Sequence, residues 1–165
     1  MPRPRRRRQD QPRNRTSGGR SGPRVAVRFY AGWDIDKAVV NDPNAIQSVM
    51  VDGVPMGGVL RNNNSKQASP GFFVWATSYP MDAPLQRVQM IKGWIDAEGQ
   101  TQEKVVDIAC ADGLAVDLAT GRCPDNGATV DLNSCNFSTD SGANELKTVW
   151  HDPDFDPAQN AFYYA

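Results

Sequence analysis

Apolar and polar residues alternate in several short stretches of this chain, and this two-residue period predicts strands. In "RVAVRFYAGW", Val25, Val27 and Phe29 alternate with other residues, as expected of a half-buried strand. "FFVWATS" is a second run, rich in the aromatic and β-branched residues that strands favour. The apolar pattern therefore begins with two predicted strands.

The clearest local pattern is that of a long antiparallel hairpin. Two extended runs, 85–96 and 103–110, flank the turn-rich "AEGQT". Apolar residues fall on both faces of the first run, so we expect both faces to be at least partly covered. This arrangement is typical of a hairpin inside a sandwich.

Helical signals are few. Asp42 and Pro43 suit an N-cap and a first helical position for a short helix over 43–50, and Gly53 would end it. Later, "TVDL" predicts a short strand, "NELKTVW" a strand or one helical turn, and "AFYYA" a strand that the chain end truncates. The fold class predicted for 25–165 is a mainly β, antiparallel, sandwich-like domain with little helix.

The charge is divided between two parts of the 165-residue chain. Residues 1–24 hold nine arginines and one acid, whereas the chain from Val25 onward holds nine basic and eighteen acidic residues. The basic segment has almost no large apolar side chain, so we expect a disordered tail. An arginine-rich arm for nucleic acid is the alternative, but an acidic body repels phosphate, so this partner is not expected. No apolar run is long enough to predict a membrane span.

The final segment, "DPDFDPAQNAFYYA", places Asp152, Asp154 and Asp156 at every second position. An EF-hand is excluded because Pro157 and Tyr163 occupy the places of its glycine and its bidentate glutamate. The pattern favours a rigid turn that leads into the last strand. A looser cation site at the three aspartates is a weak alternative.

Candidate catalytic residues are scarce. His151 is the only histidine, and a hydrolytic site would need it to converge with Asp152 or Asp154 and with a nucleophile or a metal. The sequence offers no such further group, so we expect no catalytic residue in this chain. A hydrolase that uses His151 remains the least favoured function.

The cysteines and the aromatic residues each allow two interpretations. Cys110, Cys123 and Cys135 form no CxxC pair, which favours a disulfide over zinc and leaves the pairing open. Exposed aromatic residues would suit a carbohydrate platform, although in a small sandwich they are more often core or interface residues. The aromatic residues in question are Trp33, Trp75, Trp94, Phe72, Phe73, Tyr163 and Tyr164.

Four stretches in this order, "GPRVAVRFYAGWD", "GVPMGG", "LQRVQMIKGW" and "DPDFDPAQNAFYYA", resemble the C-terminal part of a bacterial family known as domain-of-unknown-function 3604. The resemblance covers about 22–165, and that family is related to the PHP (polymerase and histidinol phosphatase) metal-dependent hydrolases. One departure is Val59, where the family tends to carry an acidic residue.

The resemblance implies a fragment of a longer, exported protein. The family's metal-binding histidines lie in an N-terminal PHP-like region without a counterpart here, so a divalent metal is implied for that region and no cofactor for this chain. We therefore expect a non-catalytic, periplasmic or secreted region that packs on the missing hydrolase region. The predicted interface residues are Trp33, Pro55, Met56, Gly57, Gly58, Trp94, Asp154 and Asp156.

One other function and one other partner remain open. A stand-alone module that binds carbohydrate or a cation is the runner-up function. A homo-oligomer is the other alternative, because a strand at the end of the chain leaves an exposed sheet edge.

Overall fold

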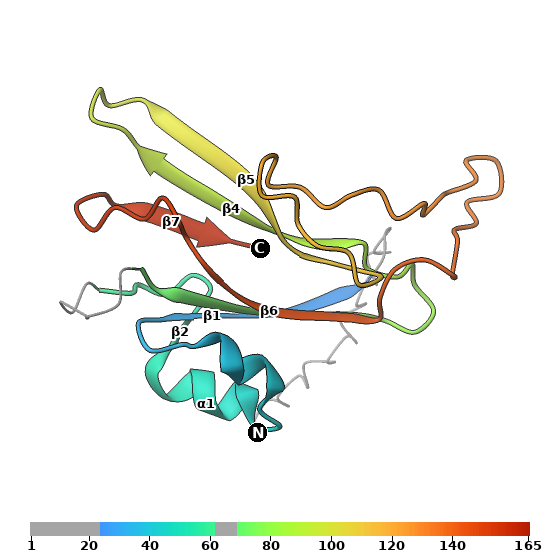
Figure 1. The fold of residues 1–165 in the computed structure, drawn as a ribbon, viewed down its shortest axis with the longest axis horizontal. Helices are drawn as coiled ribbons and strands as arrows, with labels where there is room; N and C mark the ends of the chain where they lie inside the picture. The colour runs from blue at the N-terminus through green and yellow to red at the C-terminus, as the bar shows by residue number, and fades with distance from the viewer. Residues whose placement is uncertain (1–23, 62–68) are drawn as a thin grey trace, which may run out of the picture.

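The computed structural model describes residues 24–61 and 69–165 (Figure 1). The predicted disordered tail, apart from Arg24, lies outside the described residues. Within them, no helix is long and apolar enough to cross a membrane. The elements, in chain order, are β1 (Val25–Gly32), η1 (Lys37–Asn41), α1 (Ala45–Asp52), β2 (Val54–Pro55), β3 (Gly71–Ser78), β4 (Arg87–Ile95), β5 (Thr101–Cys110), β6 (Glu145–His151) and β7 (Ala161–Tyr164).

The strands form two antiparallel sheets that face each other (Figure 1). The four-stranded sheet has the order β2-β1-β3-β6, and the three-stranded sheet has the order β5-β4-β7. The helices η1 and α1 pack on the outer side of the four-stranded sheet, below it in Figure 1. The predicted mainly β, sandwich-like fold is confirmed.

The predicted hairpin is also confirmed. Strands β4 and β5 pair from Ile95 and Thr101 at the turn to Arg87 and Cys110 at the far end. The register shifts once, between Val88 and Gln89, where a β-bulge increases the local bend.

The main core lies between the sheets, and a smaller core lies beneath the helices. Phe72 and Val74 of β3 join Met90 of β4 in the main core. Phe73 is fully buried and points the other way, against Val49 of α1. Neighbouring residues of β3 thus fill opposite layers because side chains alternate along a strand.

The helical region differs from the prediction. Helix α1 begins at Ala45, two residues later than expected, and the preceding 3-10 helix η1 was not predicted. Asp42 still stabilises the start of α1: the Asn44 N–H donates to its Oδ1 and the Ser48 hydroxyl to its Oδ2. Gly53 follows the last helical residue, as predicted.

Two predicted strand features are also corrected. The "TVDL" segment makes only a single bridge, between Val130 and Phe137, in the long loop that joins β5 to β6. Val25 and Val27 are 44% and 40% exposed, and they lie in the part of β1 that pairs with β3 but not with β2. Regular burial in β1 begins only at Phe29.

Candidate functional site

A cleft of about 660 Å³ opens where β2 and β7 form the edges of the two sheets. Its walls are the turn 54–60, the inner side chains of β1 and β3, and the segment from Phe155 to Tyr164. This volume lies within the usual range of about 300–1,000 Å³ for ligand pockets. The cleft is therefore large enough to hold a ligand or part of a partner.

The "GVPMGG" turn forms one rim of the cleft. Gly57 has a φ of +87°, which favours glycine, and a Cβ at Gly58 would lie only 2.9 Å from the Pro55 carbonyl oxygen. The Gly58 N–H donates to that oxygen over 2.8 Å, which closes the turn. As a result, Met56 and Val59 are held at the rim with 47% and 73% of their surface exposed.

An aromatic pair forms one end of the cleft. The rings of Trp33 and Phe155 meet edge to face, with their centroids 5.8 Å apart. The Trp33 Nε1–H donates to the Arg61 carbonyl oxygen over 2.9 Å, and Trp33 is only 8% exposed. Trp33 therefore contributes to the wall and offers no exposed face of the kind a carbohydrate platform uses.

The "DPDFDP" turn is joined to the opposite sheet by a buried ion pair. Lys92 of β4 and Asp152, which are 5% and 4% exposed, meet with 2.6 Å between Nζ and Oδ2. Lys92 also donates to the Asp154 carbonyl oxygen over 2.9 Å, and the Asp154 N–H donates to Asp152 Oδ1. Each polar group in this buried cluster thus has a partner, as burial requires.

Tyr163 completes this cluster from β7. Its hydroxyl donates to Asp152 Oδ2 over 2.8 Å, and its ring lies 4.4 Å from that of Phe72, centroid to centroid. Burial and the adjacent Asp152 carboxylate raise the pKa of the Tyr163 hydroxyl far above its ordinary value. Tyr163 therefore stays protonated and serves as a hydrogen-bond donor.

The other two aspartates of the turn have local roles. The Lys104 ammonium hydrogen-bonds to the Asp154 carboxylate, and this bond and the lysine charge lower the pKa of Asp154. Asp156 Oδ1 accepts the Ala158 N–H over 2.9 Å, the pattern of an Asx turn. The rigid turn predicted from the sequence is what these bonds produce.

No group of three His, Cys, Asp or Glu side chains among the described residues is placed to hold a metal ion. His151 ends β6 and its ring lies beside Gly71, the residue with which it pairs across the sheet. Asp152 and Asp154 each have a lysine as their ionic partner. The cation site and the His151 hydrolase site remain predictions without a contact that favours them.

A second buried carboxylate, Asp107, lies at the disulfide. Cys110 and Cys123 are joined, with their Cα atoms 5.6 Å apart, which confirms the predicted disulfide, and Cys135 is exposed and free. Asp107 accepts hydrogen bonds from the Cys123 N–H, the Gln89 amide and the Arg87 guanidinium. Burial alone would raise the pKa of Asp107, but these donors outweigh it and hold the pKa below its ordinary value.

The structure brings together most of the predicted interface residues. Pro55, Met56, Gly57, Gly58 and Trp33 line the cleft, and Asp154 and Asp156 flank Phe155 at its end. Trp94 instead lies on β4, with the Lys92 ammonium 5.2 Å from its ring centroid.

The sequence analysis missed Lys92, Lys104 and Asp107. Lys92 shares a strand face with Met90 and Trp94, so a charge on an otherwise apolar face was the available signal of a buried pair. The identity of its partner, 60 residues away, could not be read from that pattern.

Fold and site together define a small antiparallel β-sandwich with one open, apolar side. Residues 10–165 match the family model described as "Protein of unknown function (DUF3604)", so the chain belongs to that family. No curated protein and no solved structure matches the chain.

Proposed function

We propose that this domain is a non-catalytic accessory region that docks on another part of a larger protein through its open side. The observation that carries the proposal is the cleft: two motifs about 100 residues apart in the sequence, "GVPMGG" and "DPDFDP", meet around it. Apolar side chains remain exposed there, with Met56 47% and Val59 73% accessible. Contiguous exposed apolar surface of this kind marks interaction sites.

The partner that we propose is a PHP-like, metal-dependent hydrolase region of the same polypeptide. The resemblance of this chain to the C-terminal part of such proteins supports that assignment, and any divalent metal would then belong to the partner region. The Cys110–Cys123 disulfide supports an exported, periplasmic or secreted location, because disulfides persist in oxidising compartments. The role of this chain is to bind and to stabilise, and no chemistry is required of it.

The internal bonds of the turn support docking over metal binding. The Asp152 carboxylate accepts hydrogen bonds from Lys92 and Tyr163, and the Asp154 carboxylate accepts one from Lys104. These bonds keep the turn rigid at the end of the cleft. A rigid surface loses little conformational entropy on association. The geometry thus suits a preformed protein-binding surface.

The test uses a longer family member that contains both regions. Removing the region equivalent to this chain should lower the melting temperature of the remainder and its hydrolytic activity. A lysine at the positions of Met56 and Val59 should weaken the contact without unfolding the sandwich, because both side chains are exposed. Unchanged activity and stability after the deletion would contradict the proposal.

A further inference from the structure

We propose that the occupant of the cleft is an extended polypeptide strand that pairs with the free edge of β7. This strand would become the fourth of the three-stranded sheet, with apolar side chains facing the cleft and lysine or arginine side chains facing out. The inference rests on the proposed docking function and specifies how the partner is recognised.

The layout of the sheets provides the place for such a strand. Strand β5 lies against β6, so the two sheets overlap from the β6 edge of the four-stranded sheet. Three strands, β5, β4 and β7, then face four strands, β6, β3, β1 and β2. The three-stranded sheet ends at β7, whereas the four-stranded sheet continues to β2. A strand added to β7 would lie over β1 and β2, where Phe29, Val54 and Met56 line the cleft.

The other edges of the two sheets carry features that disfavour pairing. Strand β2 has only two residues and ends in Pro55, and β6 carries Glu145 and Lys147. At the β5 edge, the Asp107 N–H already donates to the Gly121 carbonyl oxygen. Short length, proline, charge and covering loops are the usual means by which proteins block edge pairing.

Strand β7 is also short, with four residues, but it lacks charge and proline. It consists of Ala161, Phe162, Tyr163 and Tyr164, without charge or proline, and among the described residues it pairs only with β4. An uncharged free edge beside an apolar cleft is the arrangement used in strand addition, in which backbone hydrogen bonds give affinity and alternate side chains give specificity.

The outer side chains of β7 favour a basic partner. The rings of Phe162 and Tyr164 stack with centroids 6.1 Å apart and are 60% and 40% exposed. Outward lysine or arginine side chains on a neighbouring strand would lie beside these rings, where cation–π attraction is available.

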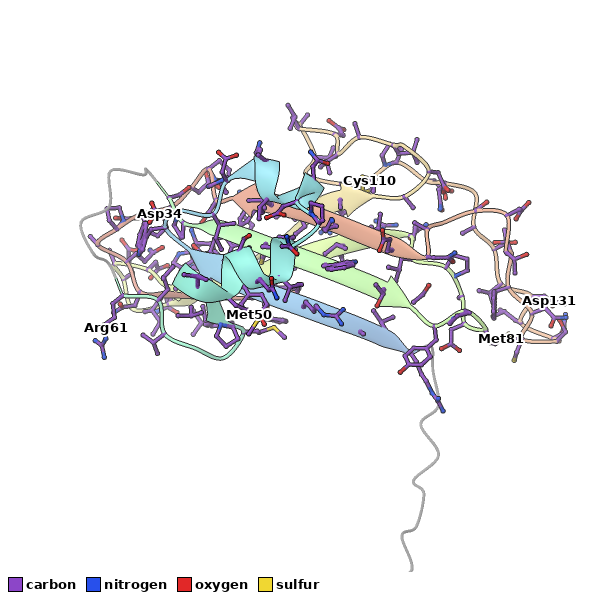
Figure 2. The ribbon with its side chains drawn as sticks, turned by 90° about the horizontal axis from the view of Figure 1, so that it is seen from below. Asp34, Met50, Arg61, Met81, Cys110 and Asp131 are labelled. Carbon is purple, nitrogen blue, oxygen red and sulfur yellow. A yellow bond between two sulfur atoms is a disulfide. The ribbon has the colours of Figure 1, made fainter. Side chains whose placement is uncertain are left out.

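Charge distinguishes a basic partner from a second copy of the chain. From Val25 onward the protein carries nine basic and eighteen acidic residues, so two such bodies repel each other. Asp154 beside Phe155 is paired with Lys104, but Asp34 follows Trp33 and Asp156 follows Phe155, so two further acids stand against Arg61 at the aromatic end of the cleft. Figure 2 shows Asp34 and Arg61 at the same end of the molecule. Charge complementarity therefore selects a basic strand.

The test probe is a fluorescein-labelled peptide of alternating lysine and valine, Lys-Val-Lys-Val-Thr-Val-Lys-Val-Lys, added to the 165-residue chain. We expect saturable binding by fluorescence anisotropy. In two further versions, either the odd-numbered or the even-numbered backbone nitrogens are methylated, so that each version lacks the N–H donors of one strand edge. At least one of these versions should bind about tenfold more weakly than the parent peptide. A glutamate-for-lysine version should bind more weakly than the parent peptide because the chain from Val25 onward, which contains the cleft, is acidic.

Amide hydrogen exchange locates the contact. The peptide should slow exchange of the outward N–H groups of Ala161–Tyr164 and leave those of β5 unchanged. Met56→Lys and Val59→Lys should each reduce affinity by about tenfold. Met81→Lys adds the same charge at an 89% exposed residue at the opposite end of the molecule from Arg61, and should change affinity less than about twofold (Figure 2). Circular dichroism would verify that each variant is folded.

Several results would overturn the inference. They are absence of binding, equal binding of both methylated peptides and the parent, unchanged exchange in β7, or protection confined to β5. Concentration-dependent dimerisation with protection of β7 would instead identify a second copy as the occupant. Any of these results can coexist with a successful docking test in a longer family member, so failure of strand addition is distinguishable from failure of the proposed function.

Discussion

Two buried carboxylates hold different parts of this sandwich together. Asp152 joins the two sheets: its partners are Lys92 of β4 and Tyr163 of β7, 60 and 11 residues away. Asp107 joins a hairpin to the loop that follows it, and its partners lie 15 to 20 residues away. The first carboxylate fixes how the sheets face each other and so shapes the cleft, whereas the second fixes a loop on one sheet.

The two carboxylates also differ in how they are compensated. Asp152 faces one buried ammonium, while Asp107 is shared by two partly exposed arginines, an amide and a backbone N–H. Removing one member of a buried pair leaves an isolated buried charge, but a shared carboxylate retains other donors. We therefore expect the largest effects of substitution at the Asp152 cluster.

The largest effect is expected for Asp152→Ala. This change leaves the Lys92 ammonium buried without its counter-ion, which should lower the free energy of unfolding by about 3–5 kcal/mol. Urea titration would measure the loss. The matched control is Lys92→Met with Asp152→Leu, which removes both charges and should recover most of the stability. A double variant less stable than Asp152→Ala would contradict this account.

The second effect concerns the disulfide beside Asp107. Cys110→Ser with Cys123→Ser opens a 13-residue separation and should cost about 2–4 kcal/mol of unfolding free energy. Cys135→Ser is the control, because Cys135 is exposed and free. Thermal unfolding with and without reductant would check both variants. If reductant lowered the melting temperature of the wild type, the double variant and Cys135→Ser equally, the result would be inconsistent with the Cys110–Cys123 pairing.

The third effect depends on pH. The pKa of Asp107 in the folded protein lies below its ordinary value of about 3.9, because donors from Cys123, Gln89 and Arg87 outweigh the effect of burial. A lowered pKa adds stability that is present above about pH 4 and is lost as the pH falls through the folded value.

Asp107→Asn removes this titration, so the stability difference between wild type and variant should shrink as the pH falls below about 4. Denaturant titrations at a series of pH values from neutral to acidic would measure it. Asp117→Asn is the comparison at an exposed carboxylate: bonds from Ala119 and Thr120 also lower the pKa of Asp117, so the change with pH should have the same direction but be smaller than at Asp107. A difference that stays constant with pH would rule out Asp107 as a contributor.

The same contrast explains what could be predicted from the sequence. Period-two alternation in "RVAVRFY" and the flanks of "AEGQT" predicted β1 and the β4–β5 hairpin, because neighbouring residues determine those patterns. Helix α1 was placed two residues early, since Asp42 bonds to Asn44 and Ser48 without forming the N-cap. The Lys92–Asp152 pair depends on the packing of one sheet on the other, which no local pattern specifies.

The smallest effect is expected at the exposed end of the Asp152 turn. Lys104 and Asp154 form an ion pair, but their side chains are 47% and 59% exposed, so solvent screens the attraction. Lys104→Met should lower the free energy of unfolding by less than about 1 kcal/mol, and the loss should decrease as salt increases. Urea titrations at low and high salt would compare it with Asp152→Ala, whose partner is buried and whose loss should change little. A loss at Lys104 as large as that at Asp152 would show that the whole turn, and not the buried pair alone, holds the two sheets together.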